Sequence, residues 1–387
     1  MKKIMLITMD EAFCNKIERR FNAENFTIMR INDVQSAYMP LEAEQLHTII
    51  ADIPNIDHAE NFFKFLHKHY PSVIRIGIAN SPYGTEVKGK SFAQMSWQKK
   101  RDVTELIFMV EKLLEMNDRI NNPELLNLVS NLRHLPTLPT IYSELSQMVE
   151  ENASVEDISL KIEEDQAVAS NVLKLANSAF YNAKTGSIKQ AIMYIGLNNV
   201  KNIILTNAVF DNAALDLNFK ETHWKHVNLA NKILNAIYIE IFGKKLNNNI
   251  SAVGLLHDVG TIVLMCNFPK MLGEIVESTK REHNKDIYLI EKSQIGFSHE
   301  ELGGHLLDLW GLPMPIVEVA LYHHTPLDPN IVNKELTMAM HIADYYAWKT
   351  VDVDDAEQGL NALVFAELGY PKEVFDAFME NFIRDEL

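Results

Sequence analysis

Cysteine is nearly missing from this sequence, since only Cys14 and Cys266 occur among 387 residues. Two cysteines cannot build a disulfide framework, and the paired C-x-x-C motifs of zinc sites are absent. No apolar run approaches the roughly 20 residues that cross a bilayer, and the apolar start of the chain is too short for a secretory signal. These absences predict a cytoplasmic protein with no membrane partner.

Positive charge is also scarce. The chain has 36 Lys and Arg residues against 52 Asp and Glu, which gives a formal net charge of −16 at pH 7. An acidic surface of this kind repels the phosphate backbone, so we do not expect a nucleic-acid partner. The share of hydrophobic residues, 47%, is ordinary for globular proteins, and the length predicts two or three domains.

The first hundred residues alternate short apolar runs with helical periods. Ile4–Thr8, His47–Ala51 and Val73–Ala79 are strand candidates, whereas Ala12–Phe21 and Phe62–His69 have helical spacing. Continuous apolar strands alternating with helices predict an α/β domain with a doubly wound parallel sheet that is covered on both faces.

Nearly all of the chain after Asp102 has helical periodicity. The run Asn121-Asn122-Pro123 interrupts that pattern and predicts a break. We therefore expect an α/β domain at 1–116, a helical linker at 117–134 and an all-α domain at 135–387. The acidic run that opens at Asp352 is expected to form a solvated helical face of a C-terminal extension.

Acidic residues follow two of the predicted strands, Asp10 after the first and Asp52 after the second. A phosphoryl-accepting site at the carboxyl ends of parallel strands needs a carboxylate nucleophile, further carboxylates for Mg²⁺ and a lysine. This layout resembles response-regulator receiver domains over residues 1–116. The resemblance implies Asp52 as phospho-acceptor, Asp10 and Glu11 at or beside the acidic pair, and Lys99 as the lysine.

Two residues depart from the receiver pattern. Met9 stands where the family usually has its first acid, and Ala79 stands where it has a hydroxyl residue. A working phospho-acceptor at Asp52 and a docking domain that retains Asp52 only as a strand-end residue are therefore both open.

Nine of the fourteen histidines follow residue 220, and several of them stand next to acids in apolar helical contexts. Imidazole and carboxylate ligands that converge from several helices are how di-iron and di-manganese sites are built. A buried His-Asp pair costs free energy unless it is paired or binds metal. The candidate ligands for Fe or Mn are His226, His257, Asp258, His299, His323, His324 and Asp344.

Each candidate also has a purely structural explanation. His257-Asp258, in an apolar helix expected to end at Gly260, is suited to a hydrogen-bonded fold determinant. His323-His324 is suited to capping the C-terminus of its helix, where positive charge is favourable. His299 is suited to the start of a helix. His223, His283, His305 and His341 are interpreted as non-ligands.

Residues 125–350 resemble the HDOD family. The resemblance rests on LPTLP, LKLANSAFY, IGL, a W-x-H at 224–226, LLHDVG, GHLLDLWGLP and YHHTP, in this order. HDOD domains are relatives of the HD and HD-GYP metal-dependent phosphohydrolases and are generally regarded as regulatory. The resemblance implies that the seven candidates occupy the positions where HD-GYP enzymes have their metal ligands.

The HD-GYP pattern is incomplete. HHTPLDPN replaces the GYP signature, Thr325 replaces an acid, and Thr222 stands where a further glutamate ligand is common. No lysine follows His257-Asp258 before Lys270, although HD enzymes commonly use one to hold phosphate. Recognition of a cyclic dinucleotide is therefore not expected.

The sequence leads to three hypotheses about function. The first is a bacterial signal-transduction protein in which the receiver-like domain controls a largely non-catalytic HDOD protein-interaction domain. Its partners would be signalling proteins, including a histidine kinase or a second copy of the chain. The alternatives are a metal-dependent phosphohydrolase, in which two metals activate water, and a metal-based sensor.

Overall fold

The structure is a computed structural model that divides the chain into two compact units. It describes residues 2–24, 26–70, 72–79, 93–99, 101–132, 139–177, 184–211, 217–246, 250, 253–282, 286–351 and 359–386. Most of the LPTLP run, the SAFY end of the second motif, His283 and the acidic run from Asp352 to Glu357 lie outside these residues. The first unit contains Met1–Asn122 and the short segment Gly311–Met314, and the second contains Pro123–Trp310 and Pro315–Leu387.

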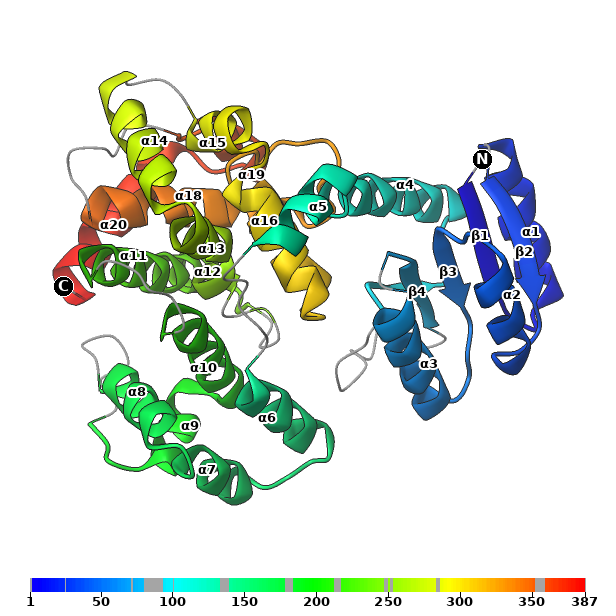
Figure 1. The fold of residues 1–387 in the computed structure, drawn as a ribbon, viewed down its shortest axis with the longest axis horizontal. Coiled ribbons are helices and arrows are strands. Elements are labelled where there is room, and N and C mark those ends of the chain that lie inside the picture. The colour runs from blue at the N-terminus through cyan, green and yellow to red at the C-terminus, as the bar shows by residue number, and fades with distance from the viewer. Residues whose placement is uncertain are drawn as a thin grey trace. The chain divides into compact units, whose positions relative to one another are not determined.

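The first unit has a five-stranded parallel sheet with strand order β2-β1-β3-β4-β5 (Figure 1). This is the flavodoxin-like order of doubly wound sheets, so the predicted α/β class is confirmed. The strands are β1 (Lys2–Ile7), β2 (Phe26–Ile31), β3 (Thr48–Ala51), β4 (Ile74–Ala79) and β5 (Met95–Gln98). Its helices are α1 (Glu11–Ala23), α2 (Tyr38–Ala43), α3 (Ile56–His69) and α4 (Val103–Ile120), with a 3₁₀ turn at Gln35–Ala37.

Helices cover both faces of this sheet. On one face Met5 and Ile49 pack with Leu41 of α2 and Phe62 of α3 in a buried core. On the other face α1 packs against α4, whose apolar stripe is buried. Asp10 begins α1 because its carboxylate accepts a hydrogen bond from the Phe13 amide, as expected of an N-cap.

The second unit is helical. Its helices are α5 (Pro123–Asn131), α6 (Thr140–Glu150), α7 (Val155–Glu163), α8 (Gln166–Ala176), α9 (Ile188–Ile195), α10 (Leu197–Asp211), α11 (Leu217–Ala236), α12 (Val253–Leu256), α13 (Val259–Asn267), α14 (Pro269–Glu282), α15 (Ile287–Ile295), α16 (His299–Leu309), α17 (Met314–Tyr322), α18 (Lys334–Val351), α19 (Leu363–Leu368) and α20 (Lys372–Glu386). One π-helical turn, Ile237–Ile241, extends α11.

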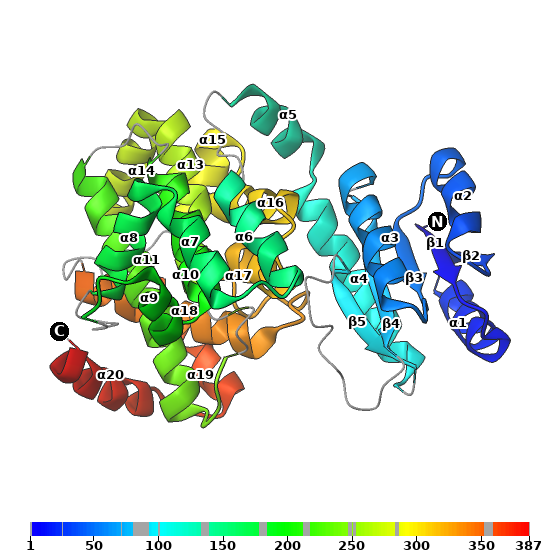
Figure 2. The ribbon, with the colours of Figure 1, turned by 90° about the horizontal axis from the view of Figure 1, so that it is seen from below.

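Two groups of helices make up this unit. Helices α6 to α10 pack on one another, as both views show (Figure 1 and Figure 2). In the other group, α11 runs against α18, and α13 against α16. Helix α10 contacts α12 and α13, which joins the two groups. The candidate ligands lie on α11, α16 and α18, in the break between α12 and α13, and at the end of α17.

The part of the chain that the structure describes contains no single helix with the length and apolarity needed to cross a bilayer. The required length and apolarity are reached only when two segments are taken together, Val253–Asn267 and Pro269–Glu277, and this pair is bent by 117°.

Candidate metal centre

The structure brings all seven predicted ligands together within the second unit. They come from five places in the fold: the middle of α11, the break between α12 and α13, the start of α16, the end of α17 and the middle of α18. Six of them are buried, and His324 is partly exposed. They form two groups, which we call the first and the second triad.

The first triad consists of His226, His257 and Asp258, whose ligand atoms lie within 4.8 Å of one another. The Nε2 atoms of His226 and His257 are 3.4 Å apart. Asp344 joins this triad, because its Oδ1 lies 3.0 Å from His226 Nε2 and 3.2 Å from His257 Nε2. Two imidazoles and two carboxylates suit Fe or Mn.

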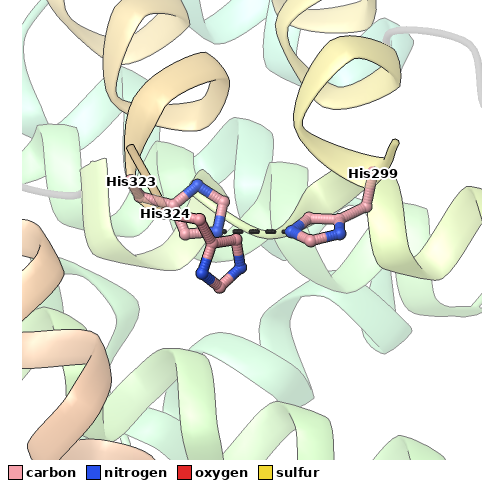
Figure 3. Close-up of side chains that lie close together, drawn as sticks. All are labelled: His299, His323 and His324. Atoms are coloured by element: carbon pink, nitrogen blue, oxygen red, sulfur yellow. Dashed lines mark hydrogen bonds between the residues drawn. The ribbon is translucent and has the colours of Figure 1, made fainter. Parts of the chain in front are cut away.

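The second triad consists of His299, His323 and His324 (Figure 3). The Nε2 atoms of His299 and His323 are 3.4 Å apart. The rings of His323 and His324 lie side by side, with centroids separated by 4.1 Å. This group offers nitrogen ligands alone, so the two triads differ in ligand chemistry.

The two triads are neighbours. The ring centroids of His257 and His323 are 5.0 Å apart. Asp258 Oδ1 lies 3.7 Å from His299 Nε2, which places this carboxylate at the boundary between the triads. An oxygen ligand in that position could bridge two metal ions.

Two glycines permit the close helix packing behind this arrangement. A Cβ at Gly254 would lie 2.5 Å from Asn231 Cα, so α12 can approach α11 only without a side chain there. A Cβ at Gly260 would lie 2.0 Å from the carbonyl oxygen of His299, so the same holds for α13 against α16. The prediction that a helix ends at Gly260 is wrong. The helix breaks at His257-Asp258, and Gly260 lies in the first turn of α13.

The outer ring nitrogens of three histidines are already used as donors. His257 Nδ1 donates to Gly254 O at 2.8 Å, and His323 Nδ1 donates to Ala320 O at 3.0 Å. His299 Nδ1 donates to Glu291 Oε2 at 2.6 Å. When these rings are neutral, the lone pair of each Nε2 therefore points toward the centre of the cluster.

Two facing lone pairs repel each other unless a cation lies between them. When both rings are neutral, His299 Nε2 and His323 Nε2 are in this relation at 3.4 Å. Two imidazole nitrogens bound to one metal at about 2.1 Å are about 3.0–3.5 Å apart for angles near 90–110°. The spacing and the donor set therefore fit a divalent transition metal at each triad. A proton on one ring is the other way to relieve the repulsion.

Burial lowers the pKa of some of the clustered histidines, whereas a neighbouring carboxylate raises the pKa of others. Burial is the main cause that lowers the pKa of His324 to about 3 and of His223 to about 4. Burial also opposes a charge on His299, but the Glu291 carboxylate outweighs it and raises the pKa of that ring to about 10. Burial opposes a charge on Asp344 too, yet its hydrogen bonds from His226 and His257 hold the pKa well below the ordinary value.

We expect the metal-free protein to lose stability as the pH falls from 6.5 toward 4. In that window His223 and His324 take up a proton when unfolded but not when folded. Each therefore removes about 1.4 kcal/mol of unfolding free energy per pH unit. The contribution of His299 is constant in that window, because a group whose pKa is raised on folding stabilises fully below its unfolded pKa. That contribution is then lost progressively as the pH rises from 6.5 to about 10. Urea unfolding at pH 7, 6 and 5 measures this; equal midpoints would contradict it.

Three side chains near the triads were not predicted. Trp348 stacks on His226 with ring centroids 3.9 Å apart and an interplanar angle of 14°. Glu291 and Tyr288, both on α15, contact His299 and His324 respectively. Their sequence contexts are those of ordinary helical residues. The only available signal was the spacing of Trp348 from Asp344, which puts both on one face of α18.

Two histidines interpreted as non-ligands have clear partners. His341 Nδ1 donates to the carbonyl oxygen of His323 at 2.7 Å, and its Nε2 accepts a hydrogen bond from the Asn361 amide at 2.9 Å. Both ring nitrogens are thus occupied by backbone groups. His223 Nδ1 lies 3.6 Å from Asp258 Oδ2, and its ring stacks on Phe219. His305 is buried in α16.

The first unit brings together most of its own predicted site. Lys99 Nζ lies 2.5 Å from Asp52 Oδ2 and 3.1 Å from Asp10 Oδ2. The Thr8 hydroxyl donates to the same Asp52 oxygen at 2.8 Å. Glu11 is exposed in the first turn of α1 instead. A hydroxyl and an ammonium group therefore contact Asp52, while one Asp10 oxygen caps α1.

The comparison with known families identifies the helical unit. A model of the HDOD domain matches residues 135–326. Residues 135–326 form an HDOD domain. Asp344 lies beyond the matched range, although it contacts the first triad.

Solved structures support the same fold. An HDOD domain protein of unknown function from Geobacter sulfurreducens is 24% identical, covers 67% of this chain and 93% of its own, and has a TM-score of 0.55. A protein from Shewanella amazonensis, described provisionally as a phosphohydrolase, is 22% identical, covers 65% of this chain and 90% of its own, and has a TM-score of 0.51.

A similar structure from Marinobacter aquaeolei, described provisionally as a signal transduction protein, has a TM-score of 0.52 at 19% identity, covering 72% of this chain and 64% of its own. An uncharacterized protein of Treponema pallidum is 24% identical over 207 residues, or 51% of this chain. The match spans only 39% of that curated relative.

Proposed function

We propose that this chain is a bacterial signal-transduction protein in which the receiver-like unit controls the HDOD domain, and that the HDOD domain holds divalent Fe or Mn at the two triads. Signalling proteins, including a histidine kinase or a second copy of the chain, are its partners in this proposal, and its location is cytoplasmic. The bound metal serves to hold the interaction domain in one arrangement or to report on redox state.

One observation carries the metal part of this proposal. In each triad two imidazole Nε2 atoms lie 3.4 Å apart, and in the second triad both Nδ1 atoms already serve as donors. When the rings are neutral, lone pairs held this way would be a costly use of buried polar groups unless a metal ion or a proton lies between them. The metal ion is the alternative that the proposal adopts.

The regulatory part is supported by what surrounds the triads. The ligands are mostly buried, and no hydrogen bond or ion pair of the described residues joins a lysine or arginine to any of them. Thr222 and Thr325 stand where enzymes of the related HD-GYP class have acids. A phosphate substrate would thus find neither a cationic partner nor a complete acidic set.

A phosphohydrolase is the second candidate, because Asp258 lies at the boundary between the triads. Bound metals would supply an activated water there. The seven candidate residues, Asp258 and Asp344 among them, would hold the metals. One of the similar structures is described provisionally as a phosphohydrolase.

Elemental analysis of the purified protein tests the proposal. We expect about one or two Fe or Mn ions per chain, and His257→Ala should lose the ion of the first triad. Removal of a ligand weakens metal affinity by more than the 10–100-fold typical of second-shell partners. Wild-type protein that folds but contains no transition metal would refute the metal centre. Hydrolysis of bis(p-nitrophenyl) phosphate by metal-loaded protein, absent in the variant, would favour the second candidate.

A further inference from the structure

We propose that Glu291 is a positioning residue that presents His299 to a metal ion at the second triad. This inference rests on the proposed metal centre. It concerns the Nδ1 side of the His299 ring, which faces away from the metal and for which the sequence suggested no partner.

Glu291 is fully buried on α15, and its contacts are concentrated on one residue. Its Oε2 accepts a hydrogen bond from the His299 amide at 2.8 Å and another from His299 Nδ1 at 2.6 Å. Its Oε1 has no hydrogen-bond partner among the described residues. A buried carboxylate is expensive, so its use for two bonds to a single histidine points to a role that needs the charge.

His299 needs an outside partner because of its place in the fold. His257 and His323 donate Nδ1 to carbonyl groups three residues earlier, Gly254 and Ala320, near the ends of their own helices. His299 is the first residue of α16 and has no preceding helical turn. The Glu291 carboxylate takes the place of that carbonyl and directs His299 Nε2 toward His323.

The charge adds to this geometry. A carboxylate that accepts the outer N–H of a metal-binding histidine fixes the tautomer of the ring and raises its basicity as a ligand. Neither His257 nor His323 has such a partner for Nδ1, because both donate to neutral carbonyl groups. Of His257, His299 and His323, His299 is therefore the one whose metal affinity depends on a charged residue of another helix.

Helix α15 contacts a second imidazole as well. Tyr288, one turn before Glu291, stacks on His324 with ring centroids 5.8 Å apart and an interplanar angle of 9°. Lys292 pairs with Glu301 of α16 at 2.6 Å and fastens α15 to the helix that His299 begins. One helix thus restrains two of the three rings in the second triad.

The test compares Glu291→Leu and Glu291→Gln with wild type in a Co²⁺ titration followed by visible absorption. Glu291→Leu should weaken binding at the second triad by about 10–100-fold while the first triad changes little. Glu291→Gln, whose amide oxygen still accepts both hydrogen bonds but has no charge, should lose less Co²⁺ affinity than Glu291→Leu and so rescue part of it. If Glu291→Leu does not fold, the Gln variant decides alone, and unchanged affinity in it would overturn the charged role.

Glu318→Gln is the matched control. Glu318 is also buried, but its carboxylate accepts hydrogen bonds from Val332 and Asn333, outside both triads. We expect wild-type Co²⁺ affinity in this variant. An equal loss of Co²⁺ affinity in Glu291→Gln and Glu318→Gln would mean that any buried glutamate supports metal binding. That result would overturn a specific role for Glu291.

A second readout separates this inference from the metal centre itself. In NMR spectra of the metal-free protein, the Nδ1 proton of His299, assigned with His299→Asn, should appear downfield in wild type and vanish in Glu291→Leu. If wild type binds no Co²⁺ but shows this proton, the metal centre fails while Glu291 still positions the ring. If the proton is absent from wild type, the role of Glu291 is overturned.

Discussion

Replacing Gly260 by alanine is expected to lower the unfolding free energy of the second unit by about 3 kcal/mol or more. The added Cβ would lie 2.0 Å from the carbonyl oxygen of His299 and 2.8 Å from the amide nitrogen of Gly303, both of which are backbone atoms. No rotamer change can relieve such a contact, so α13 must move away from α16. Because Asp258 and His299 flank this contact, the shift should also weaken metal binding. Urea unfolding followed by circular dichroism measures the first effect.

Gly273→Ala provides the comparison within the same unit. Gly273 lies in α14, and a Cβ there would meet nothing within 4 Å. Alanine should stabilise this helix by about 0.5–1 kcal/mol. If both variants unfold at the same urea concentration as wild type, the close approach of α13 and α16 would be contradicted.

Replacing Asp344 by alanine should have an effect of similar size, but by an electrostatic route. Its Oδ1 accepts hydrogen bonds from His226 and His257, and Asp344 is buried. Removing one partner of a buried, charge-assisted group costs about 3–5 kcal/mol. The first triad also loses a candidate oxygen ligand, so the stabilisation that we expect added Fe²⁺ or Mn²⁺ to give wild type should largely disappear. Thermal unfolding with and without metal measures both the loss of unfolding free energy and the loss of stabilisation by metal.

Two further variants sharpen this experiment. Asp344→Asn keeps an acceptor oxygen without the charge and should fall between wild type and Asp344→Ala. Asp376→Ala removes a more exposed carboxylate that contacts Tyr346 and Lys372, and it should cost only about 1 kcal/mol. Equal losses for Asp344→Ala and Asp376→Ala would show that burial at the first triad gives Asp344 no special role.

The interior of the sheet could be predicted from sequence, whereas its edges could not. The apolar runs near Ile4, Ile49 and Ile76 predicted β1, β3 and β4, which are the three central strands. Strands β2 and β5 lie at the edges, where burial is incomplete and polar residues such as Arg30 interrupt the apolar pattern. Edge strands of this kind carry little periodic signal.

The candidate site divides in the same way. The seven candidate ligands could be predicted because His and Asp are rare in apolar helices and because their order resembles a known family. Their partners could not, since Glu291 looks like any helical acid until α15 packs near α16. Gly260 was assigned to a helix end because the sequence does not show which helix its bare backbone approaches.

The contacts of α18 bear on how this domain can be excised or recombined. The HDOD match ends at residue 326, yet Asp344 reaches the first triad, Trp348 covers His226, and His341 joins the backbone of His323 to that of Asn361. A fragment cut at the edge of the match would keep six of the seven candidate ligands and lose the restraints on three of them, His226, His257 and His323. For gene fusions and domain exchange, the smallest unit that can be moved intact therefore extends past Asn361.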